Sequence, residues 1–233
     1  MDREICPLIL LFYALILGFY YTNSYKSVFL CFWMIVVDVE TTGTDSSKHE
    51  IINIGALDFD NPANLFYEDL RVLGPMENDS PEAFEVNGYN SHEIREPARK
   101  HPDKAVRDFL EWASKIHDIT PAGHNPGFDV DFLSALAKRH NVEFHFGHRF
   151  NDLHGLCYSH YKRRGILPPL KNRRTDIDSD KVMIYVGLPP ESKPHRSGLT
   201  GAKLEAEAFS RFFHGKPLFE EYKECPVPDY LRV

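Results

Sequence analysis

Residues 34–43 read MIVVDVETTG and indicate a buried β-strand that ends in a functional site. Residues 35–37 are β-branched, as is typical of a central strand, and a glycine closes the run. Side chains along a strand alternate between its two faces, so Asp38 and Glu40 point to the same side. Two carboxylates close together on a buried strand are costly unless a cation neutralises them. Because Mg²⁺ and Mn²⁺ prefer oxygen ligands, the pattern predicts a site for one of these ions.

A simpler interpretation is a solvated strand end that carries two acids by chance. The residues that follow, Thr41, Thr42 and Gly43, favour the functional interpretation, because their hydroxyl and amide groups could hold a phosphate or a sugar.

The motif DVETTG resembles the first motif of the DEDD superfamily of 3′→5′ exonucleases, which includes the proofreading subunit of bacterial DNA polymerase III, RNase T and oligoribonuclease. The resemblance implies an α/β, RNase H-like fold: a mixed five-stranded sheet with helices on both faces. It also implies hydrolysis of phosphodiester bonds at the 3′ end of DNA or RNA, with release of nucleoside 5′-monophosphates. Two Mg²⁺ or Mn²⁺ ions roughly 4 Å apart would stabilise the attacking and leaving oxygens.

A second motif lies in the stretch 119–140, where a short strand is followed by Asn-Pro-Gly and then by a helix. Asp129 falls in the first turn of that helix, where the helix dipole favours a carboxylate. The resemblance carries Asp129 over as a metal ligand. It also assigns substrate contacts to His124 and Asn125, and to Phe128 a role in stacking on or wedging the terminal base.

A third motif is half present. His195 stands before a helix predicted from about residue 201 to 213, where the DEDDh subgroup of the family places its general base. Imidazole suits this task because its ordinary pKa is near 6.5. The subgroup's fourth acid falls on Thr200 by strict counting, or on Gly201 by alignment of the helix, and neither can bind a metal as a carboxylate does. Glu205 stands one helical turn further along and could reach back to the site.

Two functional states remain open from the sequence. In one, Glu205 replaces the missing acid and the protein is an active exonuclease; in the other, the protein is a non-catalytic or weakly active nucleic-acid-binding module. Four costly polar groups around one cleft favour the active state. If Glu205 were only a solvated helix residue, Gly201→Asp would be expected to raise activity by restoring a carboxylate.

Composition and charge limit the alternatives. The chain has 233 residues, which suits one well-buried domain, and a net charge of −7, which argues against a polybasic nucleic-acid binder. Two basic clusters, at residues 162–164 and 171–174, are the candidates for steering a nucleic-acid backbone. The four cysteines have no paired spacing, so a reducing, cytoplasmic location is expected.

The first 33 residues have two interpretations. Residues 5–21 form an uncharged run of 17, near the lower limit for a membrane-spanning helix, so they could anchor the protein to a membrane. Alternatively, Met34 is the natural start and residues 1–33 are an upstream extension, which is the favoured interpretation. The expected organisation is this extension, an exonuclease domain over 34–215 and a C-terminal tail over 216–233.

Hydrophobic periodicity and turn residues predict the remaining elements. Strands are expected over 51–59, 65–73 and 142–150, and helices over 103–117, 153–164 and 178–188.

Overall fold

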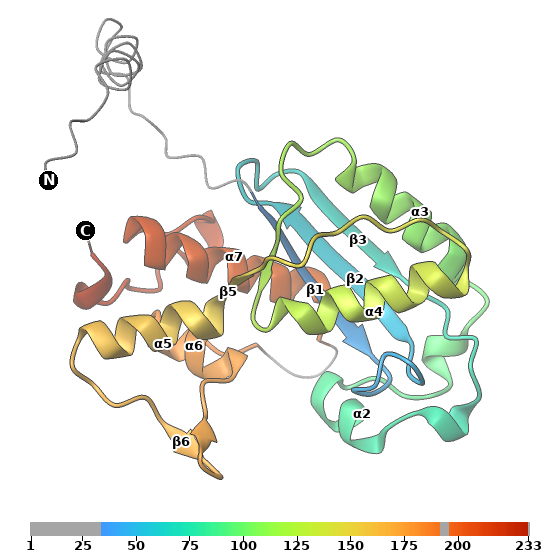
Figure 1. The fold of residues 1–233 in the computed structure, drawn as a ribbon, viewed down its shortest axis with the longest axis horizontal. Helices are drawn as coiled ribbons and strands as arrows, with labels where there is room; N and C mark the ends of the chain where they lie inside the picture. The colour runs from blue at the N-terminus through green and yellow to red at the C-terminus, as the bar shows by residue number, and fades with distance from the viewer. Residues whose placement is uncertain (1–33, 192–195, 233) are drawn as a thin grey trace, which may run out of the picture. The chain divides into compact units, whose positions relative to one another are not determined.

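The centre of the molecule is a mixed five-stranded sheet with strand order β3-β2-β1-β4-β5 (Figure 1). The computed structural model describes residues 34–191 and 196–232. The strands are β1 Ile35–Thr41, β2 Ile51–Asp58, β3 Leu65–Asp69, β4 Pro121–Gly123 and β5 Asn151–Asp152. β1 pairs antiparallel with β2 and parallel with β4. Its residues 35–37 have no exposed surface, as the β-branched run predicts for a central strand.

Helices cover both faces of the sheet (Figure 1). One face packs against α3 Pro102–Ala113 and α4 Pro126–Arg139. The other packs against α5 Leu153–Arg163, α6 Ser179–Tyr185 and α7 Gly198–His214. The shorter elements are η1 Met76–Asn78, α2 Pro81–Asn87, η2 Glu93–Arg95, β6 Leu170–Lys171, β7 Arg174–Thr175, η3 Glu220–Tyr222 and η4 Asp229–Leu231. The predicted α/β fold is therefore confirmed.

The strand predicted over residues 142–150 does not form, and β5 begins only at Asn151. The alternating aromatic residues there have another partner. Phe144 and Phe146 stack on each other with ring centroids 4.9 Å apart, and Phe146 stacks on Phe109 of α3 at 5.7 Å. The alternation thus reflects packing of an irregular segment against a helix, rather than pairing within a sheet.

Residues 216–232, most of the expected C-terminal tail, pack on the α7 side of the core. A buried ion pair within α7 holds them: the Arg211 Nε donates to Glu207 Oε1 at 2.8 Å, and both side chains are fully buried. Arg211 also donates to the carbonyl oxygen of Cys225, and Glu207 accepts the backbone N–H of Leu218. This segment is therefore part of the folded unit that carries the sheet.

Within the described residues, no helix is both long enough and apolar enough to cross a membrane. Residues 1–33, including the apolar run 5–21, lie outside the described residues.

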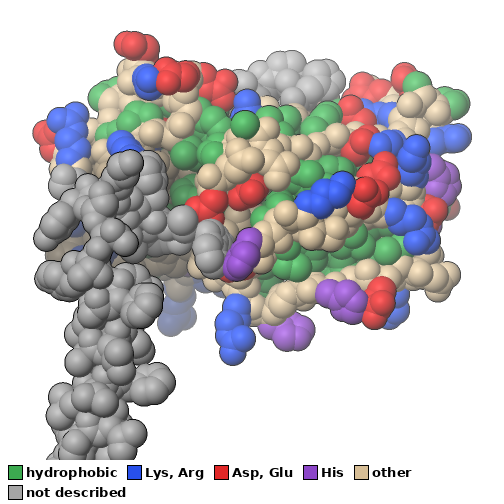
Figure 2. Space-filling model, turned by 90° about the horizontal axis from the view of Figure 1, so that it is seen from above, with side chains coloured by type: hydrophobic (Ala, Val, Ile, Leu, Met, Phe, Trp, Pro, Cys, Tyr) green, Lys and Arg blue, Asp and Glu red, His purple; other side chains and the backbone are tan. Residues whose placement is uncertain are grey.

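The molecular surface seen from above carries acidic and basic side chains interspersed among apolar ones (Figure 2).

Candidate active site

Asp38 and Glu40 lie on the face of β1 that packs against α7, and both are half-buried. Val36, two residues earlier on the same face, belongs to the core that α7 helps to form. The alternation of strand side chains thus places both carboxylates under α7, as the sequence predicts.

Asp129 reaches β1 through the connection between β4 and α4. Because β1 and β4 are parallel, their carboxyl ends lie at the same edge of the sheet. Asn125, with φ of 59°, caps α4 in a left-handed conformation, and the helix begins at Pro126. Asp129 is therefore in the first turn, where it is 4% exposed and its Oδ1 accepts the Val39 N–H at 2.9 Å.

The first turn of α7 lies directly on β1 and β2 because glycines leave room for it. The Gly198 N–H donates to Asn53 Oδ1 at 2.8 Å. A Cβ on Gly198 would come within 2.3 Å of the Asp38 carbonyl oxygen, and a Cβ on Gly55 would come within 1.9 Å of Gly198. Any side chain at either position would push the helix away from the strand. Asn53, a buried amide among the apolar residues of β2, is the sequence signal that could have located this contact.

Gly201, the aligned position of the family's fourth acid, lies against Asp38. A Cβ at Gly201 would fall 1.9 Å from Asp38 Oδ2, so the carboxylate of Asp38 occupies the space that a side chain there would need. The structure thus argues against rescue by Gly201→Asp, because the new side chain would displace the acid it is meant to assist.

Glu205 points into the site from the next turn of α7. It is 6% exposed, so it is not a solvated helix residue. Its Oε1 accepts the His124 N–H at 3.0 Å, whereas Oε2 is buried without a hydrogen-bond partner. A Cβ on Gly123 would come within 2.9 Å of Oε2 and within 3.2 Å of the Val37 carbonyl oxygen. The absence of a side chain at Gly123 makes room for this carboxylate beside β4.

Burial and mutual repulsion disfavour ionisation of all four acids. Burial, followed by the charge of Glu191, raises the pKa of Asp38 to about 7. Burial and the charge of Asp38 raise the pKa of Glu40 to about 9. The pKa values of Asp129 and Glu205 are also raised, first by burial and then by the charge of Asp38. Glu40, Asp129 and Glu205 all respond to the charge of Asp38, so the four form one electrostatic cluster that a cation would stabilise.

Glu191 and Arg196 also belong to the site, and the sequence analysis did not single them out. The Arg196 guanidinium lowers the pKa of Asp38 and of Glu40, which opposes the effect of Glu191. Glu191 Oε1 and Arg196 Nε are buried without hydrogen-bond partners, and with Glu205 Oε2 they are the three such side-chain atoms in the described part of the chain. Both residues lie in the Pro-rich stretch of sequence 189–196, which has no periodicity to mark them.

The donors present suit a hard divalent cation. Four carboxylates meet the preference of Mg²⁺ and Mn²⁺ for oxygen ligands, and the unpartnered Glu205 Oε2 is a buried acceptor that such an ion would satisfy. Among the residues that the structure describes, no three acidic, His or Cys side chains already converge as a finished metal-ligand group. Convergence of the acids would therefore accompany binding, since their charges repel one another without an ion.

Thr41, Thr42 and Gly43 lie at the end of β1 but are buried. The Thr41 hydroxyl donates to the Gly43 carbonyl oxygen at 2.7 Å, and the Thr42 hydroxyl oxygen accepts the Glu50 N–H at 3.0 Å. Both hydroxyls are thus used in shaping the turn.

Three other predicted substrate-binding residues lie next to the acids. His124 contacts Glu205 through its backbone, Asn125 is the exposed cap of α4, and the half-buried Phe128 packs on Phe132 with ring centroids 4.8 Å apart. His195, the predicted general base, lies outside the described residues.

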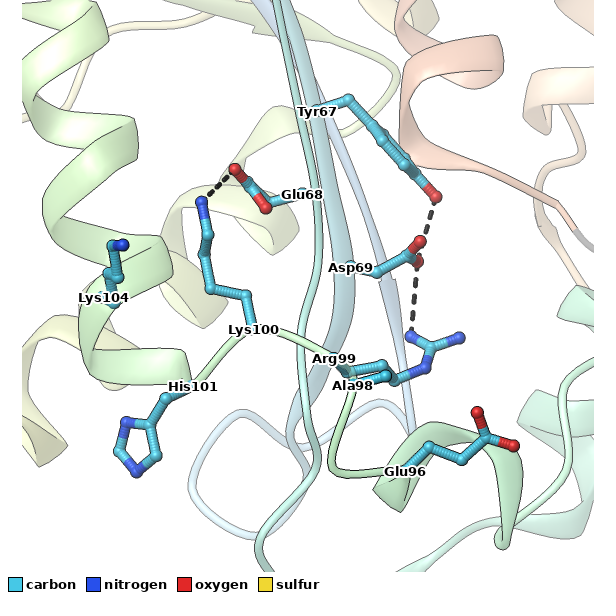
Figure 3. Close-up of a pocket in the computed structure, with 9 residues that line it drawn as sticks. All are labelled: Tyr67, Glu68, Asp69, Glu96, Ala98, Arg99, Lys100, His101 and Lys104. Carbon is cyan, nitrogen blue, oxygen red and sulfur yellow. Dashed lines mark hydrogen bonds and ion pairs between the residues drawn. The ribbon is translucent and has the colours of Figure 1, made fainter.

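A separate pocket of about 760 Å³ lies along the edge strand β3 (Figure 3). Several of its charged side chains already have partners: Lys100 pairs with Glu68, and Asp69 accepts from both Tyr67 and Arg99. This pocket does not include any of the four clustered acids.

Comparison with known sequences defines the class of protein. The sequence profile of the RNase T exonuclease family matches residues 35–175, which include β1, α4 and three of the four clustered acids. The chain therefore belongs to the RNase T family of exonucleases, and the predicted DEDD-type resemblance is confirmed.

The chain is also similar to individual proteins, at modest sequence identity. The chain is 26% identical over 189 residues to a PolC-type DNA polymerase III of Thermotoga petrophila, covering 81% of this chain and 12% of the polymerase. It is 27% identical over 141 residues to ribonuclease T of Haemophilus influenzae, covering 56% of this chain and 62% of the ribonuclease. Among solved structures, E. coli exonuclease I in complex with a dT13 oligonucleotide is similar, with a TM-score of 0.58, 13% identity, and coverage of 77% of this chain and 41% of that enzyme.

Proposed function

We propose that the protein is a metal-dependent 3′→5′ exonuclease that hydrolyses DNA or RNA and releases nucleoside 5′-monophosphates. The observation that carries the proposal is the cluster of Asp38, Glu40, Asp129 and Glu205, in which one buried Glu205 oxygen has no protein partner. Family membership supports the same reaction class.

In this proposal the four acids hold one or two Mg²⁺ or Mn²⁺ ions, with Glu205 in place of the family's fourth Asp. A bound divalent ion supplies Lewis-acid stabilisation of charge on the phosphoryl oxygens. Arg196, beside Asp38 and Glu40, offsets part of their negative charge and presents a buried, unpartnered N–H. His195, adjacent to Arg196 in the sequence, takes a proton from the attacking water.

The proposed substrate is the 3′ end of a single strand. Phe128, beside Asp129 in the first turn of α4, offers an aromatic face for the terminal base, and His124 and Asn125 lie in the preceding turn. The structural relative exonuclease I was solved with a single-stranded oligonucleotide, which supports this choice. We also propose a cytoplasmic location, with which the free thiols of Cys157 and Cys225 are consistent.

The test is digestion of DNA and RNA oligomers labelled at either end, in Mg²⁺, in Mn²⁺ and in chelator. Stepwise loss of mononucleotides from the 3′ end only, abolished by chelator, is the expected result. Binding of the oligomers without metal-dependent release of mononucleotides would instead indicate a nucleic-acid-binding module of the same fold.

A further inference from the structure

A basic hairpin projects from the part of the chain between α5 and α6 (Figure 1). Its strands pair Leu170 with Thr175 and Lys171 with Arg174. The two residues between them, Asn172 and Arg173, both have left-handed backbone angles, with φ of 49° and 64°. This is the two-residue turn that suits the twist of a hairpin, and its second position favours glycine.

Arginine is unfavourable at that second position because a side chain strains the left-handed backbone. Its presence there therefore needs an explanation outside the turn itself. Residues of this kind persist where their side chain has a use. Here the turn directs a guanidinium to the tip of the hairpin, where Arg173 is exposed.

The hairpin and its approach carry a concentrated positive charge. Six basic and no acidic residues lie between residues 162 and 174, in a chain whose net charge is −7. Lys171, Arg173 and Arg174 are exposed and form no ion pair with any described residue. By contrast, the face seen in Figure 2 mixes the two signs of charge. Unpaired cations clustered on one hairpin favour binding of an anionic partner.

The base of the hairpin is fixed to the candidate active site. His154 Nε2 and Thr175 Oγ1 are 2.9 Å apart, and the His124 ring donates from Nε2 to the Ile177 carbonyl oxygen at 2.8 Å. The backbone N–H of the same His124 donates to Glu205, one of the four clustered acids. A ligand on the hairpin is thus held in a set position relative to those acids.

We propose that the hairpin is an arm that grips the phosphate backbone of the substrate strand upstream of its 3′ end; this inference rests on the proposed function. Strand residues advance about 3.3 Å each, so the tip lies about 10 Å beyond the base of the hairpin, which is linked to Glu205 through His124. An arm of that length, held beside the site, would contact phosphates upstream of the cleaved bond. Guanidinium groups match phosphate oxygens in a fixed fork, and the exposed Leu167 and Leu170, at 83% and 68%, add apolar surface for sugars or bases.

The test compares two triple variants that lose the same charge. Lys171→Gln, Arg173→Gln and Arg174→Gln together remove the arm's cations. Lys104→Gln, Arg107→Gln and Lys115→Gln remove three exposed cations from or next to α3, far from the hairpin (Figure 1). Binding of a labelled long dT oligomer is measured by fluorescence anisotropy in chelator, from about 0.1 to 0.5 M salt.

For the hairpin variant, the slope of log affinity against log salt should become shallower by about two, since each single-strand phosphate contact contributes about 0.7. Affinity near 0.1 M salt should then fall by about 100-fold, whereas the α3 variant should stay within about twofold of the parent. An unchanged slope in the hairpin variant, or equal losses in both variants, would overturn the proposal.

A single change separates binding from folding. Arg173→Gly suits the left-handed position, so the thermal midpoint should be equal or higher, while affinity should fall by about fivefold, the loss of one contact. A variant that gains stability without losing affinity would assign Arg173 no role in binding and would count against the arm.

Cleavage distinguishes failure of this inference from failure of the proposed function. With Mg²⁺, the hairpin variant should lose kcat/KM on the long oligomer and keep the parental value on a dT trimer, which is too short to reach the tip. If the parent cleaves and the variant matches it on both substrates, the arm is refuted and the exonuclease stands. If the parent never cleaves but the salt slopes differ as expected, the exonuclease is refuted and the arm stands.

Discussion

Glu205→Gln is the change that tests the site most directly. The amide keeps the length and helix preference of the side chain and retains an oxygen for the His124 N–H. It removes the charge that faces Asp38 and Asp129 and the buried oxygen that has no partner. A ligand role and a merely structural role therefore predict different outcomes.

The expected magnitudes follow from the burial of this cluster. A unit charge about 4 Å from another contributes about 4 kcal/mol at an effective dielectric constant of 20. After allowance for rearrangement, loss of one carboxylate ligand should weaken Mn²⁺ binding at least about 100-fold, at about 1.4 kcal/mol per tenfold change. Without metal the sign reverses: the amide has no charge to repel Asp38 and Asp129, so the variant should be at least as stable as the parent in chelator.

The assay pairs calorimetric titration of Mn²⁺ with denaturant unfolding in chelator, and Glu207→Gln is the matched control. Glu207 is two residues away on the same helix, but it forms the buried ion pair with Arg211. Its neutralisation should lower the free energy of unfolding by about 3–5 kcal/mol, because a buried guanidinium loses its partner. Metal affinity in the folded control should stay near the parental value.

A role for Glu205 in metal binding is refuted if Glu205→Gln keeps parental nuclease activity across a full Mg²⁺ titration. It is equally refuted if the variant is destabilised in chelator as Glu207→Gln is, since that result would make Glu205 a structural residue.

Four further predictions concern the same site. Asp38→Asn should abolish cleavage while the thermal midpoint in chelator equals or exceeds that of the parent, because one repelling charge is lost; a large fall in that midpoint would make Asp38 structural. Gly201→Ala should lower activity by more than about tenfold although alanine favours helices by about 1 kcal/mol, because its Cβ would meet Asp38 Oδ2 at 1.9 Å; parental activity would show that Asp38 moves freely. The folded pKa values of Asp38 and Glu40, about 7 and about 9, exceed the usual 3.8 and 4.5, so the folded state binds more protons between these limits. Stability in chelator should therefore fall as pH rises from 5 to about 9, and a thermal midpoint that rises over this range contradicts the shifts. His195→Ala should lower turnover by about 10² to 10⁴ with little change in Mn²⁺ affinity; an unchanged rate removes His195 from the mechanism.

Local rules in the sequence were sufficient for β1 and for the start of α4. Alternation along a strand puts Asp38 and Glu40 on one face wherever β1 lies, and an Asn-Pro start puts Asp129 in a first turn. Neither inference depends on residues far away in the chain. The resemblance of the same short motifs to the exonuclease family predicted the five-stranded sheet, which the structure bears out.

Sequence periodicity gave a wrong prediction where an alternating pattern could be buried in more than one way. The aromatic alternation over residues 142–150 fits a strand, but Phe146 instead stacks on Phe109 of α3, and Phe144 stacks on Phe146. Periodicity reports that one side of a segment is buried, and it does not report whether a helix or a neighbouring strand buries it.

The tertiary structure alone decided what the acids of α7 do. Glu205 and Glu207 have the same side chain and stand two residues apart, so propensity and charge pattern treat them alike. Packing separates them: Glu207 faces Arg211, whereas Glu205 faces Asp38 and Asp129, because Gly198 and Gly201 let the helix lie directly on β1. The amino-acid sequence determined which carboxylates were present, and the close contact between α7 and β1 determined which of them share one site, since that contact joins residues more than 150 positions apart.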